Sequence, residues 1–239
     1  MNAAVVFAGG VGTRMNTKSV PKQFLELFGK PIIIYTLEVF QKNPEVDAIC
    51  ISCLASHIDY MKMLCGKFGI TKAKWIVPGG ATGQESIFNG LNAVYNDHPE
   101  DDTIVLVHDG VRPNIQVELV SENIKAVKEF RSAISCAAAT ETPAEINDEG
   151  NIYTIYDRKK AVIAKAPQSF YLKDLYSAHL KARQEGKEFI DSASMMRAYG
   201  TTLHTVPCQW DNIKITNPTD YYIFKAILEA KENSQIFGL

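Results

Sequence analysis

The chain has 239 residues, of which 46% are hydrophobic and 22% are charged, and its net charge is −2. This length is enough to bury one large core, and the slightly acidic balance argues against a nucleic-acid-binding protein. No apolar run is long enough to cross a membrane, and the N-terminus lacks the basic segment of a signal peptide. We therefore expect a single domain over residues 1–239 that acts in the cytoplasm.

Short apolar runs alternate with helical patterns along the first 140 residues. This alternation predicts an α/β protein with a Rossmann-like, mostly parallel sheet and helices on both faces. Ligands of such sheets bind at the carboxyl ends of the strands. The expected strands are 3–8, 47–54, 74–77, 103–108 and 133–139, and the expected helices are 31–41, 58–68, 84–95 and 117–130.

The alternation breaks after residue 140. Two short strands within residues 143–156, joined by residues 147–150 with turn chemistry at 148–150, predict a β-arm at about 141–160 that protrudes from the sheet. The remaining elements are expected to be helices at 172–184, 191–199 and 219–233 and a strand at 202–206.

The cysteines raise the question of redox chemistry. Cys50 and Cys53 spell C-x-x-C, but they lie in an apolar run typical of a buried strand, whereas a redox pair sits at the start of a helix. Two interpretations stand, a redox pair and small core residues, and the pattern favours the second. The cysteine usage fits reduced, cytosolic thiols.

The loop after the first strand is rich in glycine. Gly9, Gly10 and Gly12 follow Ala8, and glycines let the backbone turn its N–H groups toward phosphate oxygens. Neither a Walker A motif nor the dinucleotide fingerprint is present. Arg14 and Lys22 add two cations, which suit a triphosphate whose charge grows as pyrophosphate departs. A glycine-rich turn with solvated cations is the alternative, and the full string favours phosphate binding.

This string resembles the signature of sugar-phosphate nucleotidyltransferases, and in detail that of the cytidylyltransferases that act on methylerythritol phosphate or ribitol 5-phosphate. The resemblance extends from Ala3 to about Ala230. It implies a nucleotidyltransferase-type fold, CTP and a polyol phosphate as substrates, Mg²⁺ as the cofactor, and a homodimer formed through the arm. It implies nucleotide contacts at Ala8, Gly9, Gly10, Gly12, Gly80, Ser86, Asp109 and Thr216, and phosphate contacts at Arg14, Lys22 and Lys214.

Segment 78–91 follows the third expected strand and opens a helix. Hydroxyl and N–H groups at a helix N-terminus bind phosphates and base edges, and by resemblance Ser86 contacts the cytidine. The methylerythritol enzymes usually carry an arginine where this chain has Gly83, so one nucleotide contact differs. The string Gly83 to Ser86 favours a ribitol-phosphate-type member. An ordinary loop with a helix cap is the alternative.

Asp109 follows the fourth expected strand, where a carboxylate suits Mg²⁺ bound to phosphates. By resemblance Asp109 binds metal and ribose, and Arg112 meets the acceptor. A helix-capping carboxylate is the alternative for Asp109. We interpret His108 as structural rather than as a general base, because the attacking phosphate monoester is already anionic near neutral pH.

Arg158, near the end of the arm, matches an arginine that binds the acceptor phosphate, often from the partner subunit. Bidentate guanidinium–phosphate contact explains that residue type, and a charged turn is the alternative. The Asp-Thr pair of the family's arm is absent, since this chain has Ala144 and Glu145 nearby. We therefore expect different acceptor contacts there.

Lys214 lies between two apolar residues on an expected short strand, so its side chain should point to the ligand side. By resemblance it holds the α-phosphate with help from Thr216. Segment 189–194 resembles another family string, and it equally fits a helix cap with acid in the first turn.

These residues together predict a Mg²⁺-dependent transfer of CMP from CTP. We favour D-ribitol 5-phosphate as the acceptor, which gives CDP-ribitol for a cell-surface polymer such as teichoic acid or capsule. 2-C-Methyl-D-erythritol 4-phosphate is the alternative acceptor. A non-catalytic nucleotide-binding module is a second class of protein, and full pyrophosphate release by a Lys22→Ala variant would favour it. A nicotinamide dehydrogenase is a third class, disfavoured by the missing third glycine.

Overall fold

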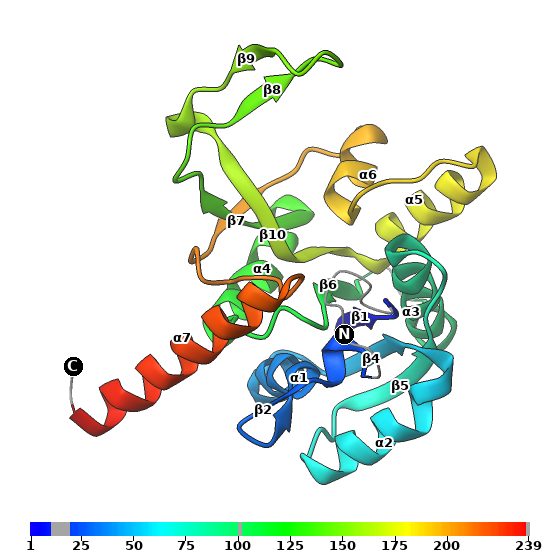
Figure 1. Ribbon diagram of the computed structural model, residues 1–239. Coiled ribbons are helices and arrows are strands. Elements are labelled where there is room, and N and C mark those ends of the chain that lie inside the picture. The colour runs from blue at the N-terminus through cyan, green and yellow to red at the C-terminus, as the bar shows by residue number, and fades with distance from the viewer. Residues whose placement is uncertain (11–19, 100–101, 238–239) are drawn as a thin grey trace.

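The computed structural model describes residues 1–10, 20–99 and 102–237 (Figure 1). Within them a seven-stranded sheet has the order β11-β7-β10-β6-β1-β4-β5. Strand β10 is antiparallel to β6 and β7, and the other neighbouring strands are parallel. The mostly parallel α/β fold is thereby confirmed. The strands are β1 (Asn2–Ala8), β4 (Ala48–Cys53), β5 (Ala73–Pro78), β6 (Ile104–Asp109), β7 (Ser132–Ala138), β10 (Val162–Tyr171) and β11 (Thr205–Pro207).

Helices cover both faces of the sheet (Figure 1). Three helices pack on one face, α1 (Ile32–Lys42), α2 (Ile58–Lys67) and α4 (Val117–Phe130). The other face is covered by α3 (Gly83–Asp97), α5 (Leu172–Glu185) and α6 (Ser192–Ala198). Because both faces are covered, the central strands are continuous apolar runs rather than alternating ones.

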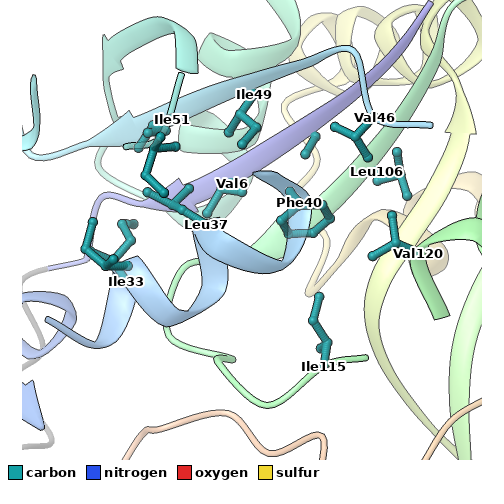
Figure 2. Close-up of a cluster of buried hydrophobic side chains, with 14 of the residues drawn as sticks. Val6, Ile33, Leu37, Phe40, Val46, Ile49, Ile51, Leu106, Ile115 and Val120 are labelled. Carbon is teal, nitrogen blue, oxygen red and sulfur yellow. The ribbon is translucent and has the colours of Figure 1, made fainter. Parts of the chain in front are cut away.

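Two cores result, one on each face. Figure 2 shows the first, where Leu37 and Phe40 of α1 lie against Val6 of β1 and Ile51 of β4. In the second core, Val5 and Leu91 pack with residues of α5 and α6. These packed layers hold the carboxyl ends of β1, β4 and β6 in fixed positions.

A long helix and several short elements complete the described residues. Helix α7 (Pro218–Phe237) anchors through Phe224, which packs on Ile32 and Ile215, and its far end extends away from the sheet (Figure 1). The short elements are β2 (Glu26–Leu27), β3 (Lys30–Pro31), η2 (Lys22–Phe24), η3 (Ala55–His57) and η4 (Arg158–Lys160). No helix in the described ranges is long and apolar enough to cross a membrane.

A hairpin of β8 (Ala144–Ile146) and β9 (Ile152–Ile155) projects beyond the sheet at the place expected for the arm (Figure 1). Its apolar side chains are uncovered, since Ile152 is 62% exposed and Ile155 is 68% exposed. Asn147 organises the turn by accepting from the N–H groups of Glu149 and Asn151.

Two expectations about strands differ from the structure. Residues 212–216, around Lys214, form no strand. A single backbone hydrogen bond, from Ile215 N to Val111 O, joins them to the segment beside them. Strand β10 was not expected, since its first residues are exposed and Pro167 interrupts its pattern. The cysteine interpretation is supported, because Cys50 and Cys53 are buried free thiols in β4 whose pKa values burial raises to about 12 and about 11.

Candidate active site

A cavity of about 240 Å³ lies where β1 ends, and we call it the loop cavity. Because parallel strands end at one edge of the sheet, Phe7 of β1 stands beside Asp109 of β6. The residues expected to bind the nucleotide meet here. The lining includes Ala8, Gly9, Gly10, Lys22, Gly80, Ser86, Asp109 and Lys214.

The wall of the loop cavity is formed by closely packed backbone. A Cβ atom on Gly9 would lie 2.5 Å from Ser86 Oγ and 3.4 Å from Gly79 Cα, so the close approach requires glycine. Ser86 Oγ is itself fixed, since it donates to Thr82 O (2.9 Å) and accepts from Gly80 N (3.0 Å). The helix-start position expected for Ser86 is confirmed, because it lies in the first turn of α3 after the capping residue Thr82.

Gln23 fixes the other side of the loop. It is buried, and its Nε2 donates to Ala8 O at 2.8 Å. The neighbouring Lys22 begins η2 and lines the cavity. The loop is therefore held at its strand end and at its return, while Gly12 and Arg14 lie outside the described residues.

Asp109 lies between two cations at the floor of the cavity. Lys214 Nζ is 2.5 Å from Oδ1, and Arg112 Nε donates to Oδ2 at 3.2 Å. Burial raises the pKa of the Asp109 carboxyl, but Lys214 and Arg112 together outweigh it, so the pKa lies below its usual value. The carboxylate is therefore ionised at neutral pH and orients Lys214.

His108 faces away from this site. Its ring packs against Phe40 at 5.3 Å, and Nε2 donates to Arg112 O at 3.0 Å. Burial lowers its pKa to about 4. This geometry supports a structural histidine that positions the turn carrying Arg112.

A second cavity of about 300 Å³ adjoins the first, and we call it the helix cavity. Four residues line both cavities, namely Phe7, Gly83, Asp109 and Lys214. The helix cavity lies between α3, β10, α5 and α6, and Arg112 and Lys165 contribute cations to it. Lys165 Nζ donates to Trp210 O and Asn212 O, at 2.6 and 3.1 Å.

Asp191, in segment 189–194, both caps a helix and lines a cavity. It caps α6 by accepting from Ser194 N at 2.8 Å, so the capping interpretation is confirmed. It also lines the helix cavity. The sequence interpretation assigned no role to Lys165, Gln168 or His179, which line this cavity too.

Two expected ligand residues lie apart from both cavities. Arg158 is exposed on the arm, where its guanidinium donates to Thr140 O at 3.1 Å. The hydroxyl of Thr216 donates to Asp220 at 2.8 Å, and Thr216 lines neither cavity. Their roles toward substrates stay predictions.

The donor set is compatible with a metal that arrives with phosphates. The described part of the chain holds no group of three or more acidic, histidine or cysteine residues that could bind a metal ion alone. Mg²⁺ is commonly held by one or two carboxylates together with substrate phosphates, and Asp109 offers one carboxylate at the cavity floor.

A glycine-lined cavity with two lysines at the carboxyl edge of a mostly parallel sheet is suited to bind the phosphates of a nucleotide, and the family match places it in a nucleotidyltransferase. Residues 2–230 match the family described as IspD: 2-C-methyl-D-erythritol 4-phosphate cytidylyltransferase. The chain belongs to this family of cytidylyltransferases.

Named relatives and a solved structure agree with this placement. The chain is 49% identical, over the full length of both, to the ribitol-5-phosphate cytidylyltransferase of Vibrio parahaemolyticus. It is 35% identical to the 2-C-methyl-D-erythritol 4-phosphate cytidylyltransferase of Clostridium novyi, over 95% of this chain and 96% of the other. The crystal structure of 4-diphosphocytidyl-2C-methyl-D-erythritol synthase from Anaerococcus prevotii superposes with a TM-score of 0.83 at 25% identity, covering 95% and 96% of the two chains.

Proposed function

We propose that the protein transfers CMP from CTP to D-ribitol 5-phosphate, releasing pyrophosphate and CDP-ribitol. The observation that carries the proposal is the Asp109–Lys214 pair at the junction of two adjoining cavities. A triphosphate in the loop cavity and a phosphorylated acceptor in the helix cavity meet at Lys214. The whole chain, residues 1–239, works as one domain in this proposal.

The reaction is an in-line displacement. An oxygen of the acceptor phosphate forms a bond to the α-phosphorus of CTP, and the bond to the bridging oxygen breaks with its electron pair leaving on pyrophosphate. A phosphate monoester has its second pKa at about 6, so it attacks at neutral pH without a general base. Positioning and charge neutralisation supply the catalysis.

Lys214 and Lys22 face the cavity that takes the triphosphate. Lys214 stabilises the charge that grows on the α-phosphate, and Lys22, with Arg14, stabilises the departing pyrophosphate. Asp109 keeps Lys214 in place and offers the carboxylate that would hold Mg²⁺, which when bound neutralises phosphate charge. Arg112 and Lys165 lie where the acceptor phosphate approaches.

The choice of ribitol 5-phosphate is supported by the named relatives and by Gly83. Relatives at 49% identity over the full chain bear the name ribitol-5-phosphate cytidylyltransferase, whereas the named methylerythritol enzyme of Clostridium novyi is 35% identical. Gly83 replaces the arginine that we associate with the methylerythritol enzymes. The product is a precursor of a cell-surface polymer made from the cytoplasmic side, and the free thiols of the described chain fit that compartment.

Pyrophosphate release tests the proposal. The purified protein is assayed with CTP, UTP, ATP and GTP against D-ribitol 5-phosphate, 2-C-methyl-D-erythritol 4-phosphate and glycerol 3-phosphate, with and without Mg²⁺. We expect the highest kcat/KM for CTP with ribitol 5-phosphate, and loss of activity without Mg²⁺. Faster turnover of methylerythritol phosphate would overturn the choice of acceptor.

We further propose a homodimer formed through the arm. The uncovered apolar side chains Ile152 and Ile155 support this, because such a surface is normally buried by a partner. In the dimer, Arg158 reaches the acceptor phosphate of the other subunit. Light scattering on the wild type and on Ile155→Glu tests the assembly, with Met63→Glu, an exposed residue of α2 that lines neither cavity, as the control. A monomeric wild type with full activity would exclude this role for the arm.

A further inference from the structure

Two buried polar side chains on the wall of the helix cavity have no hydrogen-bond partner. His179 is 1% exposed and Ser192 is 2% exposed. Both ring nitrogens of His179 and the hydroxyl of Ser192 lack a partner in the described structure. Buried polar groups are nearly always paired, because an unpaired one loses its hydrogen bonds to water without replacement. Such a pair on one cavity wall indicates a ligand with hydroxyl or amide groups.

The other polar groups of this wall are already paired. Gln168 donates from Nε2 to Asp191 (2.9 Å) and accepts from Ala193 N (2.8 Å). Gln84 accepts from Phe189 N at 2.7 Å and donates to Lys187 O. These bonds hold the wall in place, so the unpaired groups stand in a fixed frame and lose no partner when they turn toward a ligand.

The chemistry of the unpaired groups suits a polyol. Burial, with a contribution from Arg183, lowers the pKa of His179 to about 4, so its ring is neutral at pH 7. A neutral imidazole offers one donor and one acceptor, and a serine hydroxyl offers both. Because each alcohol group also donates and accepts, a chain with several hydroxyls can pair with both residues, whereas an apolar ligand can pair with neither.

The helix cavity also adjoins the place where the proposed CMP transfer occurs. Asp109 and Lys214 form its boundary with the loop cavity, and Gly83 stands at the same boundary. A Cβ atom on Gly83 would meet only Phe7, at 3.9 Å, so the backbone tolerates a side chain there. A large side chain at this position would occupy the passage, and glycine leaves it open.

We propose that the helix cavity holds the hydroxylated chain of the acceptor, with His179 and Ser192 as the hydrogen-bond partners of its hydroxyls far from the phosphate. The acceptor phosphate lies by Lys214, Arg112 and Lys165, and the carbon chain extends past Gly83 toward α5 and α6. This inference rests on the proposed function, since it assigns the acceptor side of that site. His179 and Ser192 are then residues that select the acceptor by its hydroxyls.

Variants with altered hydrogen bonding test the proposal. His179→Phe removes both nitrogens and keeps a ring against Phe88, and Ser192→Ala removes only the hydroxyl. We expect each to lower kcat/KM for ribitol 5-phosphate by about 10-fold, the effect of one or two lost hydrogen bonds, while the Kd for CTP stays unchanged. His204→Phe, whose ring stacks on Phe130 outside both cavities, is the matched control and should keep wild-type values.

Substitutions at Gly83 test whether the acceptor chain extends past this residue. Gly83→Leu should lower kcat/KM for ribitol 5-phosphate more than Gly83→Ala does, since only leucine is long enough to fill the passage. Equal kcat/KM for wild type, His179→Phe and Ser192→Ala would overturn the inference and leave the proposed function intact. If the wild type used a different polyol phosphate, the proposed function would fail, and the same variants assayed with that polyol would decide the inference.

A measurement on the wild-type protein tests the same proposal without any variant, so it does not require that a variant folds. Chemical shifts of the ¹⁵N-labelled His179 ring are recorded with CMP, and then with CMP plus ribitol 5-phosphate. A new hydrogen bond should shift at least one ring nitrogen only when the polyol phosphate is present. Unchanged His179 shifts at saturating ribitol 5-phosphate would contradict the assignment.

Discussion

The loop cavity and the helix cavity meet at Asp109 and Lys214 but are built differently. The loop cavity is walled by backbone, with Gly9 against Gly79 and with Ser86 Oγ bonded on both sides. The helix cavity is walled by side chains of several elements and keeps unpaired polar groups. In the proposed function, phosphate transfer therefore takes place against a wall of backbone, whereas the acceptor meets a wall of side chains that can determine which acceptor binds.

Removal of Lys214 should have the largest effect, because this side chain stands in both cavities. In Lys214→Ala, the charge that grows on the α-phosphate loses its fixed cation, and kcat/KM should fall by about 10²–10³-fold with every acceptor. Steady-state pyrophosphate release measures the change.

The matched control for this change is Lys225→Ala, which removes a lysine on α7 that pairs only with Glu229 in the described structure and lines neither cavity. It should retain wild-type kcat/KM. If Lys214→Ala slowed one acceptor and spared another, Lys214 would belong to acceptor binding alone and the comparison would fail.

The same contrast explains what the sequence could predict. The loop cavity follows from contiguous residues, since glycines after a buried strand and Asp109 at the end of another have local signals. Lys214 was placed on the ligand side, which the structure supports, although no strand forms there because a single backbone bond holds the segment.

The helix cavity had a weaker signal, because Arg112 and segment 189–194 matched the family's pattern whereas His179 matched nothing. His179 is one residue of an ordinary amphipathic helix, and what makes it unusual is the absence of partners on α3, β10 and α6. That absence depends on how the helices pack, which a local pattern does not contain. Strand β10, which supplies Lys165 and Gln168, was likewise hidden by Pro167 and by its exposed first half. Tertiary packing alone brings these residues together.

The buried His179 of the helix cavity should make the stability of the folded protein fall at acid pH. An unfolded histidine has a pKa of about 6.5, whereas burial and Arg183 lower that of His179 to about 4. Between these values the unfolded state binds more protons, so stability present above about pH 6.5 is lost as the pH falls. From pH 7 to pH 5 the His179 contribution amounts to about 2 kcal/mol, or about 4–8 °C in Tm.

His179→Phe has no such group, so its Tm should fall less than that of the wild type between pH 7 and pH 5. Calorimetry at several pH values compares the two, and His204→Phe serves as the control for loss of a histidine elsewhere. Parallel curves for wild type and His179→Phe would mean that the pKa of His179 is the same in the folded and the unfolded protein. The folded ring would then gain its proton between pH 7 and pH 5 like an exposed histidine, which would contradict the buried, unpaired imidazole on which the polyol contact depends.

The loop cavity itself can be tested by crowding its tightest contact. In Gly9→Ala the new methyl group would lie 2.5 Å from Ser86 Oγ, which cannot turn away without losing its bonds to Thr82 O and Gly80 N. The loop must shift, and we expect KM for CTP to rise by about 10-fold, which corresponds to about 1.4 kcal/mol. Gly66→Ala, at a helical glycine with open space around its Cβ, is the control.

The double variant Gly9→Ala/Ser86→Ala separates crowding at position 9 from loss of contact between this position and the nucleotide. Removing the hydroxyl takes away the atom nearest the new methyl group and leaves Gly79 Cα at 3.4 Å, an ordinary contact. Gly9→Ala should therefore raise KM for CTP less in the Ser86→Ala background than in the wild type, so the two changes should be less than additive. Strict additivity would show that glycine is needed at position 9 for its contact with the nucleotide rather than for packing, and the rigid wall of the loop cavity would then have to be attributed to Gln23 and the strand end.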